Sequence, residues 1–168
     1  MPGPHLRNDI NIRSPRFLLA RTVGTCWHCR TTIPLFALAV PPGHMELELD
    51  DEARDEETAV DTWRIAADSA FLFYVEYLPA AVQNRLKQFT QSYRLGDCAV
   101  AAGSYWANHC EHCGSLLDDH ELFCEPDGAF LPTDESRARI IRLAPIDEAF
   151  EAVAAGYAYE PDFFDAMA

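Results

Sequence analysis

Two copies of a Cys-x-x-Cys motif constrain this chain more than any other feature. They read Cys26-Trp-His-Cys29 near the start and Cys110-Glu-His-Cys113 far downstream. Two residues between the cysteines let a tight turn aim both sulfurs at one point, so two such pairs can surround one metal ion tetrahedrally. The motifs therefore predict one structural Zn²⁺ per chain, bound by Cys26, Cys29, Cys110 and Cys113. Iron is the alternative, because four tetrahedral sulfurs suit both metals.

The other histidines and cysteines near the motifs are not needed as ligands. His28, His109 and His112 stand beside the four cysteines. Four thiolates already close the coordination shell, so we interpret these histidines as exposed turn residues or as hydrogen-bond donors to sulfur. We expect Cys98 and Cys124 to be buried in the core, since a free cysteine packs like a small hydrophobic residue.

The net charge of the chain indicates which kind of partner it favours. Its 168 residues contain 13 Lys and Arg against 27 Asp and Glu, a net charge of −14. Such a chain should repel nucleic acid and favours a protein partner with a basic surface. Nucleic-acid binding through the knuckle face remains the second hypothesis, because five arginines lie within residues 7–30. They are Arg7, Arg13, Arg16, Arg21 and Arg30.

The expected location is the cytoplasm. No run of eighteen or more apolar residues could span a membrane, and Arg7, Arg13 and Arg16 interrupt the region where a secretory signal would need its apolar stretch. In a reducing compartment, paired Cys-x-x-Cys units more often hold metal than form disulfides.

Short apolar or β-branched runs flank both cysteine pairs. Residues 17–20 lead into the first pair and residues 31–40 leave it, while residues 104–108 and 116–117 flank the second pair. Each pair is therefore expected in a turn between two strands. Further strand pieces are expected at 122–124 and 139–143.

Helices are expected between the pairs and at the end of the chain. The first has an apolar stripe at three- and four-residue spacing, formed by Val60, Trp63, Ala67, Phe71, Tyr74 and Leu78. Pro79 suits the start of a second helix, which Val82, Leu86 and Phe89 continue. After Pro145, helical spacing recurs in Ile146, Ala149, Phe150, Val153 and Tyr157.

With these knuckles the chain resembles zinc-ribbon proteins, in which two Cys-x-x-Cys turns on β-hairpins share one zinc. The resemblance covers residues 17–40 and 104–131 and implies the same four cysteine ligands. Residues 30–109, a stretch of 80 residues, separate the pairs. An insertion accounts for this distance, since the entropic cost of closing a loop grows only logarithmically with its length. The expected fold is α+β: a zinc-ribbon hairpin core, a helical insertion and a C-terminal helix.

We expect one domain over residues 1–168. Its parts are an N-terminal arm (1–15), a first knuckle hairpin (16–45), an acidic loop with the helical insertion (46–95), a second knuckle hairpin (96–133) and a C-terminal strand, helix and tail (134–168). The acidic segment 46–57 is interpreted as a solvated loop with a helix-starting turn, because like charges repel when they are packed together. A metal or protein-docking site there is the alternative.

Catalytic interpretations are weaker than a structural metal. A dithiol redox motif should open a helix, whereas proline and β-branched residues follow Cys29. His44-Met-Glu46 together with the second cysteine pair imitates zinc deaminases, but His109 replaces the usual proline before the pair, and the first pair would be left without a role. No phosphate-binding loop, dinucleotide fingerprint or nucleophile elbow is present. The sequence therefore favours a non-enzymatic module, and a zinc hydrolase or deaminase-like enzyme is the third hypothesis.

Overall fold

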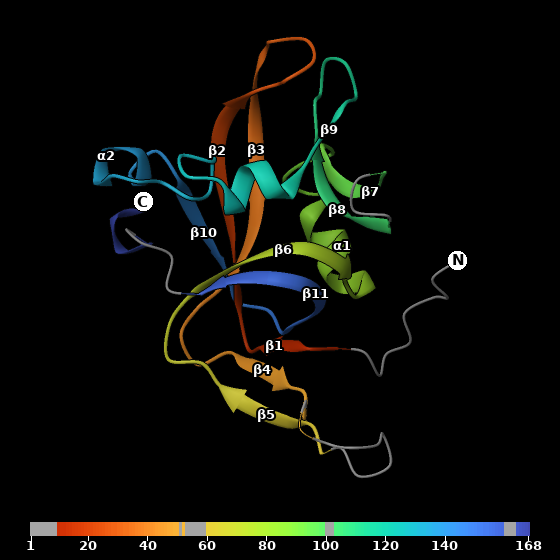
Figure 1. Cartoon of the computed structure of the whole chain (residues 1–168), viewed down its shortest axis with the longest axis vertical. Helices are drawn as coiled ribbons and strands as arrows, with labels where there is room; N and C mark the ends of the chain where they lie inside the picture. Colours follow the sequence, from red (N-terminus) through yellow and green to blue (C-terminus); the bar gives the residue numbers. More distant parts are fainter. Residues whose placement is uncertain (1–9, 51, 53–59, 100–102, 160–163) are drawn as a thin grey trace.

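The computed structural model describes residues 10–50, 52, 60–99, 103–159 and 164–168, and these form a mainly antiparallel β structure (Figure 1). The strands are β1 (Ile12–Ser14), β2 (Phe17–Thr25), β3 (Thr32–Val40), β4 (Met45–Glu48), β5 (Thr62–Ile65), β6 (Ala70–Tyr77), β7 (Tyr93–Cys98), β8 (Gly103–His109), β9 (Leu116–Leu117), β10 (Arg142–Ile146) and β11 (Phe150–Tyr159). The helical segments are α1 (Ala80–Leu86), the π-helix η2 (His120–Cys124), α2 (Glu135–Ala138) and the 3₁₀-helix η3 (Phe164–Ala166).

The sheet carries two hairpins that stand beside each other. Its main strand order is β10-β2-β3-β6-β11-β1-β4-β5, and β8 joins it by pairing with β6, β7 and β9. Strand β3 pairs with the first half of β6, as in Leu38 opposite Leu72, and β8 pairs with the second half through Val75 opposite Trp106. The β2–β3 and β8–β9 turns consequently reach the same end of the molecule (Figure 1).

A buried asparagine joins the two hairpins where no strand ladder connects them. Asn108 on β8 is completely buried. Its side-chain nitrogen donates to the Phe36 carbonyl at 2.8 Å, and its side-chain oxygen accepts from the Phe36 amide at 2.8 Å. The side-chain amide thus takes the place of a neighbouring peptide group and satisfies both polar groups of one β3 residue.

Strand β3 is central because both of its faces are buried. Phe36, Leu38 and Val40 face one hydrophobic cluster, whereas Ile33, Leu35, Ala37 and Ala39 face a second cluster that contains Cys26 and Cys110. This alternation follows from the two-residue period of a strand. The second core therefore reaches directly to the cysteine turns.

The expected α+β zinc-ribbon fold with a helical insertion is wrong. Strands make up 46% of the described residues, and the segment with the stripe from Val60 to Leu78 forms β5 and β6 instead of a helix. Tyr74 in β6 has a positive φ of 49°, which reverses the inward-facing side of the strand, so that Leu72 and Val75 lie in the same core cluster. The residues of the expected helical stripe do not share one face: Phe71 lies in the second core cluster, Leu78 lies in the first, and Val60 is exposed.

The C-terminal helix is wrong as well. Residues 150–159 form β11, which pairs with β6 and β1. Phe150, Ala152 and Ala154 share one core cluster with strand periodicity, but apolar residues on the other face concealed the pattern. Alanine favours helices intrinsically, and tertiary strand pairing overrides that preference here.

Some smaller expectations are confirmed and others are not. A helix does follow Pro79, as the short α1. Residues 122–124 lie in η2 and not in a strand, and the strand expected at 139–143 is β10, a few residues later. Within the acidic segment, residues 46–48 belong to β4, while residues 51 and 53–59 lie outside the described part, as do residues 1–9 of the expected arm. No helix among the described residues is long and apolar enough to cross a membrane.

We predict that Asn108→Ala destabilises the protein strongly. The change leaves the amide and the carbonyl of Phe36 buried without a partner, and each such loss costs about 1–3 kcal/mol. The free energy of unfolding, measured with chemical denaturant, should fall by about 2–4 kcal/mol. Asn84→Ala, at an exposed position of α1, is the matched control and should change it by less than about 0.5 kcal/mol. Equal effects of the two substitutions would contradict this role of Asn108.

A buried carboxylate accompanies the reversal in β6. The Tyr74 amide donates to Asp119 Oδ2 at 2.8 Å, and the Asp119 amide donates to the Tyr105 hydroxyl at 3.3 Å. Asp119 Oδ1 is buried and has no hydrogen-bond partner among the described residues. Burial raises the pKa of Asp119 to about 7, against the lowering effect of the Tyr74 amide, and the charge of Asp118 adds to the rise. The carboxyl group is therefore favoured in its neutral form.

The raised pKa of Asp119 predicts a pH-dependent stability. The folded state keeps a proton that the unfolded state has released, so this group stabilises the fold at low pH and the contribution is lost as pH rises towards 7. Between pH 5.5 and 8 the free energy of unfolding should fall by at least about 1 kcal/mol more in the wild type than in Asp119→Asn, since one pKa unit corresponds to about 1.4 kcal/mol. Asp68→Asn, at an exposed position, should retain the wild-type pH dependence. Parallel curves for wild type and Asp119→Asn would exclude this contribution.

Candidate metal centre

The first cysteine pair lies in the turn between β2 and β3. The Cys26 amide donates to the Thr31 carbonyl at 3.0 Å, and the Arg30 amide donates to the Cys26 carbonyl at 3.0 Å. Arg30 has a positive φ of 63°. A residue other than glycine takes that conformation at a cost of about 1–2 kcal/mol, which the turn must offset.

The second pair repeats this turn between β8 and β9. The Cys110 amide donates to the Ser115 carbonyl at 2.8 Å, and the Gly114 amide donates to the Cys110 carbonyl at 2.8 Å. Gly114 has a φ of 75°, which glycine adopts without strain. Both turns are therefore built alike, although the first has arginine where the second has glycine.

The four sulfurs come together at the distances that a tetrahedral metal requires. Cys26 Sγ lies 3.7 Å from Cys113 Sγ, and Cys29 Sγ lies 3.6 Å from Cys110 Sγ. All four lie within 4.8 Å of one another. Metal–sulfur bonds of about 2.3 Å place the sulfurs of a tetrahedron about 3.8 Å apart. The cluster fits one metal ion, and its closest contacts cross from one hairpin to the other.

The surroundings help two of the thiols to ionise. Thr31 Oγ1 lies 3.4 Å from Cys29 Sγ, and Ser115 Oγ lies 3.3 Å from Cys113 Sγ. The hydrogen bond with Thr31 lowers the pKa of Cys29, and that with Ser115 lowers the pKa of Cys113 to about 5. Burial instead raises the pKa of Cys110 to about 11. A bound cation would compensate for this burial, since metals bind the thiolate form.

Of the three histidines beside the cysteines, His109 differs from the expectation and His28 is exposed, as expected. His109 is buried, and its ring nitrogen Nδ1 lies 3.0 Å from the Ala107 carbonyl, so it is no exposed turn residue. His112 is exposed, as expected. Trp27 has an indole nitrogen that donates to the Leu116 carbonyl at 2.9 Å, although 54% of the residue is exposed. This bond is a further link between the two turns.

The remaining cysteines lie outside the cluster. Cys98 is buried, as expected, whereas Cys124 is exposed, so that part of the expectation is wrong. Among the described residues, the only group of three or more potential metal-ligating side chains consists of the four predicted cysteines.

The two catalytic interpretations find no support in this geometry. Strand β4, which carries Glu46 just after His44, lies at the end of the molecule opposite the cysteine turns (Figure 1). The buried Glu46 carboxylate lies 3.0 Å from His44 Nε2 and accepts from Arg64 at 2.9 Å. These residues form a polar cluster of their own and do not approach Cys110. The first cysteine pair opens strand β3 and no helix, unlike a dithiol redox motif.

Among the described arginines of residues 7–30, Arg30 lies at a knuckle, whereas Arg13 and Arg21 lie on strands. Arg13 on β1 pairs with Glu151 and lies over the Trp63 ring, 4.5 Å from its centroid, whereas Arg21 is on β2 and Arg30 is at the first turn. Arg7 lies outside the described residues. The sequence also gave no sign that Lys87 and Arg94, from separate elements, would share a pocket with Arg21. The one signal in the sequence that singles out a residue of this pocket is that Lys87 is the only lysine of the chain.

The fold and the cluster define an antiparallel β protein whose two hairpins present a four-cysteine site compatible with a metal ion. Comparison of the chain with protein-family models, curated proteins and solved structures found no match. The resemblance to zinc ribbons is therefore limited to the cysteines and the turns that carry them.

We predict that Cys110→Ser loses most of the bound metal and destabilises the protein by several kcal/mol. A metal held by two hairpins contributes its binding energy to folding, and structural zinc supplies about 10–16 kcal/mol in small peptides. Metal-to-protein ratios from elemental analysis, together with denaturant unfolding, measure both effects. Cys98→Ser and Cys124→Ser should keep the full metal content. Metal loss in either control, or an unchanged ratio in Cys110→Ser, would contradict the assignment of these sulfurs.

Proposed function

We propose that this chain is a non-enzymatic binding protein in which one structural Zn²⁺, held by Cys26, Cys29, Cys110 and Cys113, fixes two hairpins as one interaction surface. The observation that carries the proposal is the set of four protein sulfurs at tetrahedral spacing. Four protein ligands leave no position for water or substrate, so the ion holds the fold and does no chemistry. Elemental analysis of the purified protein distinguishes zinc from iron.

Trp27 supports an interaction surface at the joined turns. Its side chain is half exposed, yet its hydrogen bond to Leu116 fixes its position. Val23, on the same hairpin, is 55% exposed. A rigid, exposed tryptophan loses little conformational freedom on binding, and tryptophan is enriched among the residues that dominate protein interfaces. The proposed partner is a protein with a basic surface, because the net charge of −14 attracts one from a distance.

Substitution of Trp27 tests this function. Partners can be trapped by crosslinking in an extract of the native cell and identified by mass spectrometry. Proteins retained by the wild type should be lost with Trp27→Ala but kept with Ile140→Ala, which removes another exposed apolar side chain. We expect a loss of at least about tenfold, as for a central interface residue. If both variants retain the same proteins as the wild type, Trp27 is not part of a binding surface.

A further inference from the structure

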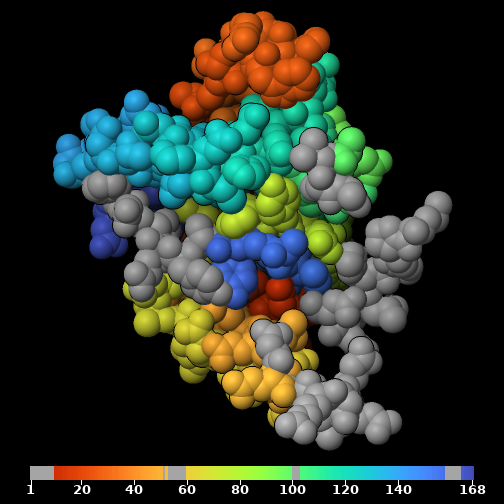
Figure 2. Space-filling model, viewed as in Figure 1, coloured from red at the N-terminus to blue at the C-terminus, as the bar shows by residue number. Residues whose placement is uncertain are grey.

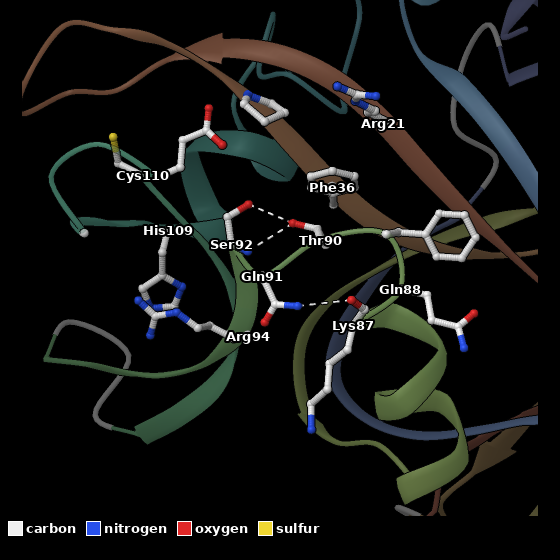
Figure 3. Close-up of a pocket in the computed structure, with 14 residues that line it drawn as sticks. Arg21, Phe36, Lys87, Gln88, Thr90, Gln91, Ser92, Arg94, His109 and Cys110 are labelled. Atoms are coloured by element: carbon white, nitrogen blue, oxygen red, sulfur yellow. Dashed lines mark hydrogen bonds between the residues drawn. The ribbon is translucent and has the colours of Figure 1, made fainter.

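An open pocket of about 750 Å³ lies beside the second cysteine turn. One wall comes from the β2–β3 hairpin, the second from the segment between α1 and β7, and the third from β7 and the end of β8 (Figure 3). Cys110, Glu111 and Gly114 complete the wall on the side of the turn. Its volume is within the range of small-molecule sites, about 300–1,000 Å³.

The pocket concentrates positive charge in a strongly acidic protein. Arg21 from β2, Lys87 directly after α1 and Arg94 from β7 all line it, and among the described residues that line it Glu111 is the only acidic one. Figure 3 shows these three cationic side chains on different walls. The β2 strand and the distant segment 87–94 therefore bring cations to one cavity, although the chain as a whole carries a net charge of −14.

Arg21, Lys87 and Arg94 differ from the ion-paired arginines of the fold, because none of the three has an acidic partner in the described part of the chain. Five arginines form ion pairs with carboxylates of other residues: Arg13, Arg64, Arg85, Arg137 and Arg139. In the described part of the chain, no carboxylate lies within ion-pair distance of Arg21, Lys87 or Arg94. Arg21 also stands directly opposite Arg142 on the neighbouring strand β10, an arrangement of like charges that destabilises a sheet. A bound anion would relieve this repulsion.

The segment from Lys87 to Ser92 is held in place before any ligand binds. The Ser92 amide donates to Thr90 Oγ1 at 3.0 Å, and the Gln91 side chain donates to the Lys87 carbonyl at 3.1 Å. The His109 amide donates to the Ser92 carbonyl at 2.7 Å, which ties this segment to β8. Preorganised hydroxyl, amide and cationic groups reduce the entropic cost of binding.

Aromatic rings line the same pocket. Phe36 packs under Arg21, whose guanidinium lies 5.9 Å from the ring centroid, and Phe89 is 48% exposed. An exposed phenylalanine offers a flat ligand a surface on which to stack. The pocket thus combines anion-binding groups with a surface for a ring.

We propose that this pocket binds a small phosphate-bearing molecule with a flat organic part, its phosphate among Arg21, Lys87 and Arg94 and its ring against Phe89. Guanidinium groups bind phosphate oxygens in pairs, which suits a doubly charged anion better than a single carboxylate. Nucleic acid is less favoured because a long polyanion would be repelled by the acidic remainder of the chain. A small ligand interacts mainly with charges within about 8–10 Å, because salt screens those further away. The pocket goes beyond the proposed interaction surface and does not depend on Trp27.

Calorimetric titration of the metal-loaded protein tests the pocket, with ADP, inorganic pyrophosphate and adenosine as probes. ADP should bind, and adenosine should bind at least about tenfold more weakly because it lacks phosphate. Lys87→Gln and Arg94→Gln should each weaken ADP binding at least about tenfold. Arg139→Gln removes the same charge directly after α2 and should change the affinity less than about twofold. Phe89→Ala should weaken ADP but not pyrophosphate. All four changed positions are exposed, and unchanged melting curves verify that the variants fold.

Several outcomes would overturn the proposal. Absence of binding by ADP and pyrophosphate at millimolar concentration excludes a phosphate site. If Arg139→Gln weakens ADP binding as much as Lys87→Gln and Arg94→Gln do, the effect is one of net charge and not of this pocket. A single-stranded oligonucleotide that binds more tightly than ADP, with an affinity that falls steeply with salt, would assign the pocket to nucleic acid instead. None of these results affects the Trp27 experiment, so the two proposals can fail independently.

Discussion

The pair of hydrogen bonds between Asn108 and the backbone of Phe36 is the interaction on which the rest of the structure depends. Strands β3 and β8 pair with different halves of β6 and not with each other, so among the described residues they are linked by the sheet only through β6. The side-chain amide sets their relative position from inside the core. The sulfur cluster lies at the ends of these hairpins, and the cationic pocket lies between them. Figure 2 shows the β2–β3 turn, in orange, projecting beyond the body of the molecule. Both sites therefore depend on the relative position of two hairpins to which this buried contact contributes.

The cysteine turns could be predicted from sequence because their chemistry is local. Two residues between cysteines define a turn whatever surrounds it, and the β-branched residues after Cys29 marked the returning strand. Gly114 also indicated a left-handed residue after the second pair. Arg30 has no such sign, yet it adopts the same conformation, because the hydrogen bonds of the turn require it.

The remaining architecture depends on contacts between distant segments. The reversal at Tyr74 needs the carboxylate of Asp119, 45 residues further along the chain, and no local pattern in residues 60–78 indicates it. The apolar spacing in these residues, taken alone, is that of a helix. The alanines of β11 similarly acquire their strand conformation from β6 and β1. The pocket could not be predicted either, since Arg21, Lys87 and Arg94 come to line one cavity only after the sheet has assembled.

The distance between the two cysteine pairs has a consequence for synthesis of the protein. Cys29 and Cys110 are 81 positions apart, and a ribosome that adds about 5–20 residues per second needs about 4–16 s between them. During that interval the nascent chain presents one hairpin with only two sulfurs, half of a coordination shell. The first pair can then bind a metal only weakly or together with ligands from other molecules, and its thiols can be oxidised. Correct maturation of this protein therefore requires that the second hairpin is translated before the cysteines of the first hairpin are oxidised.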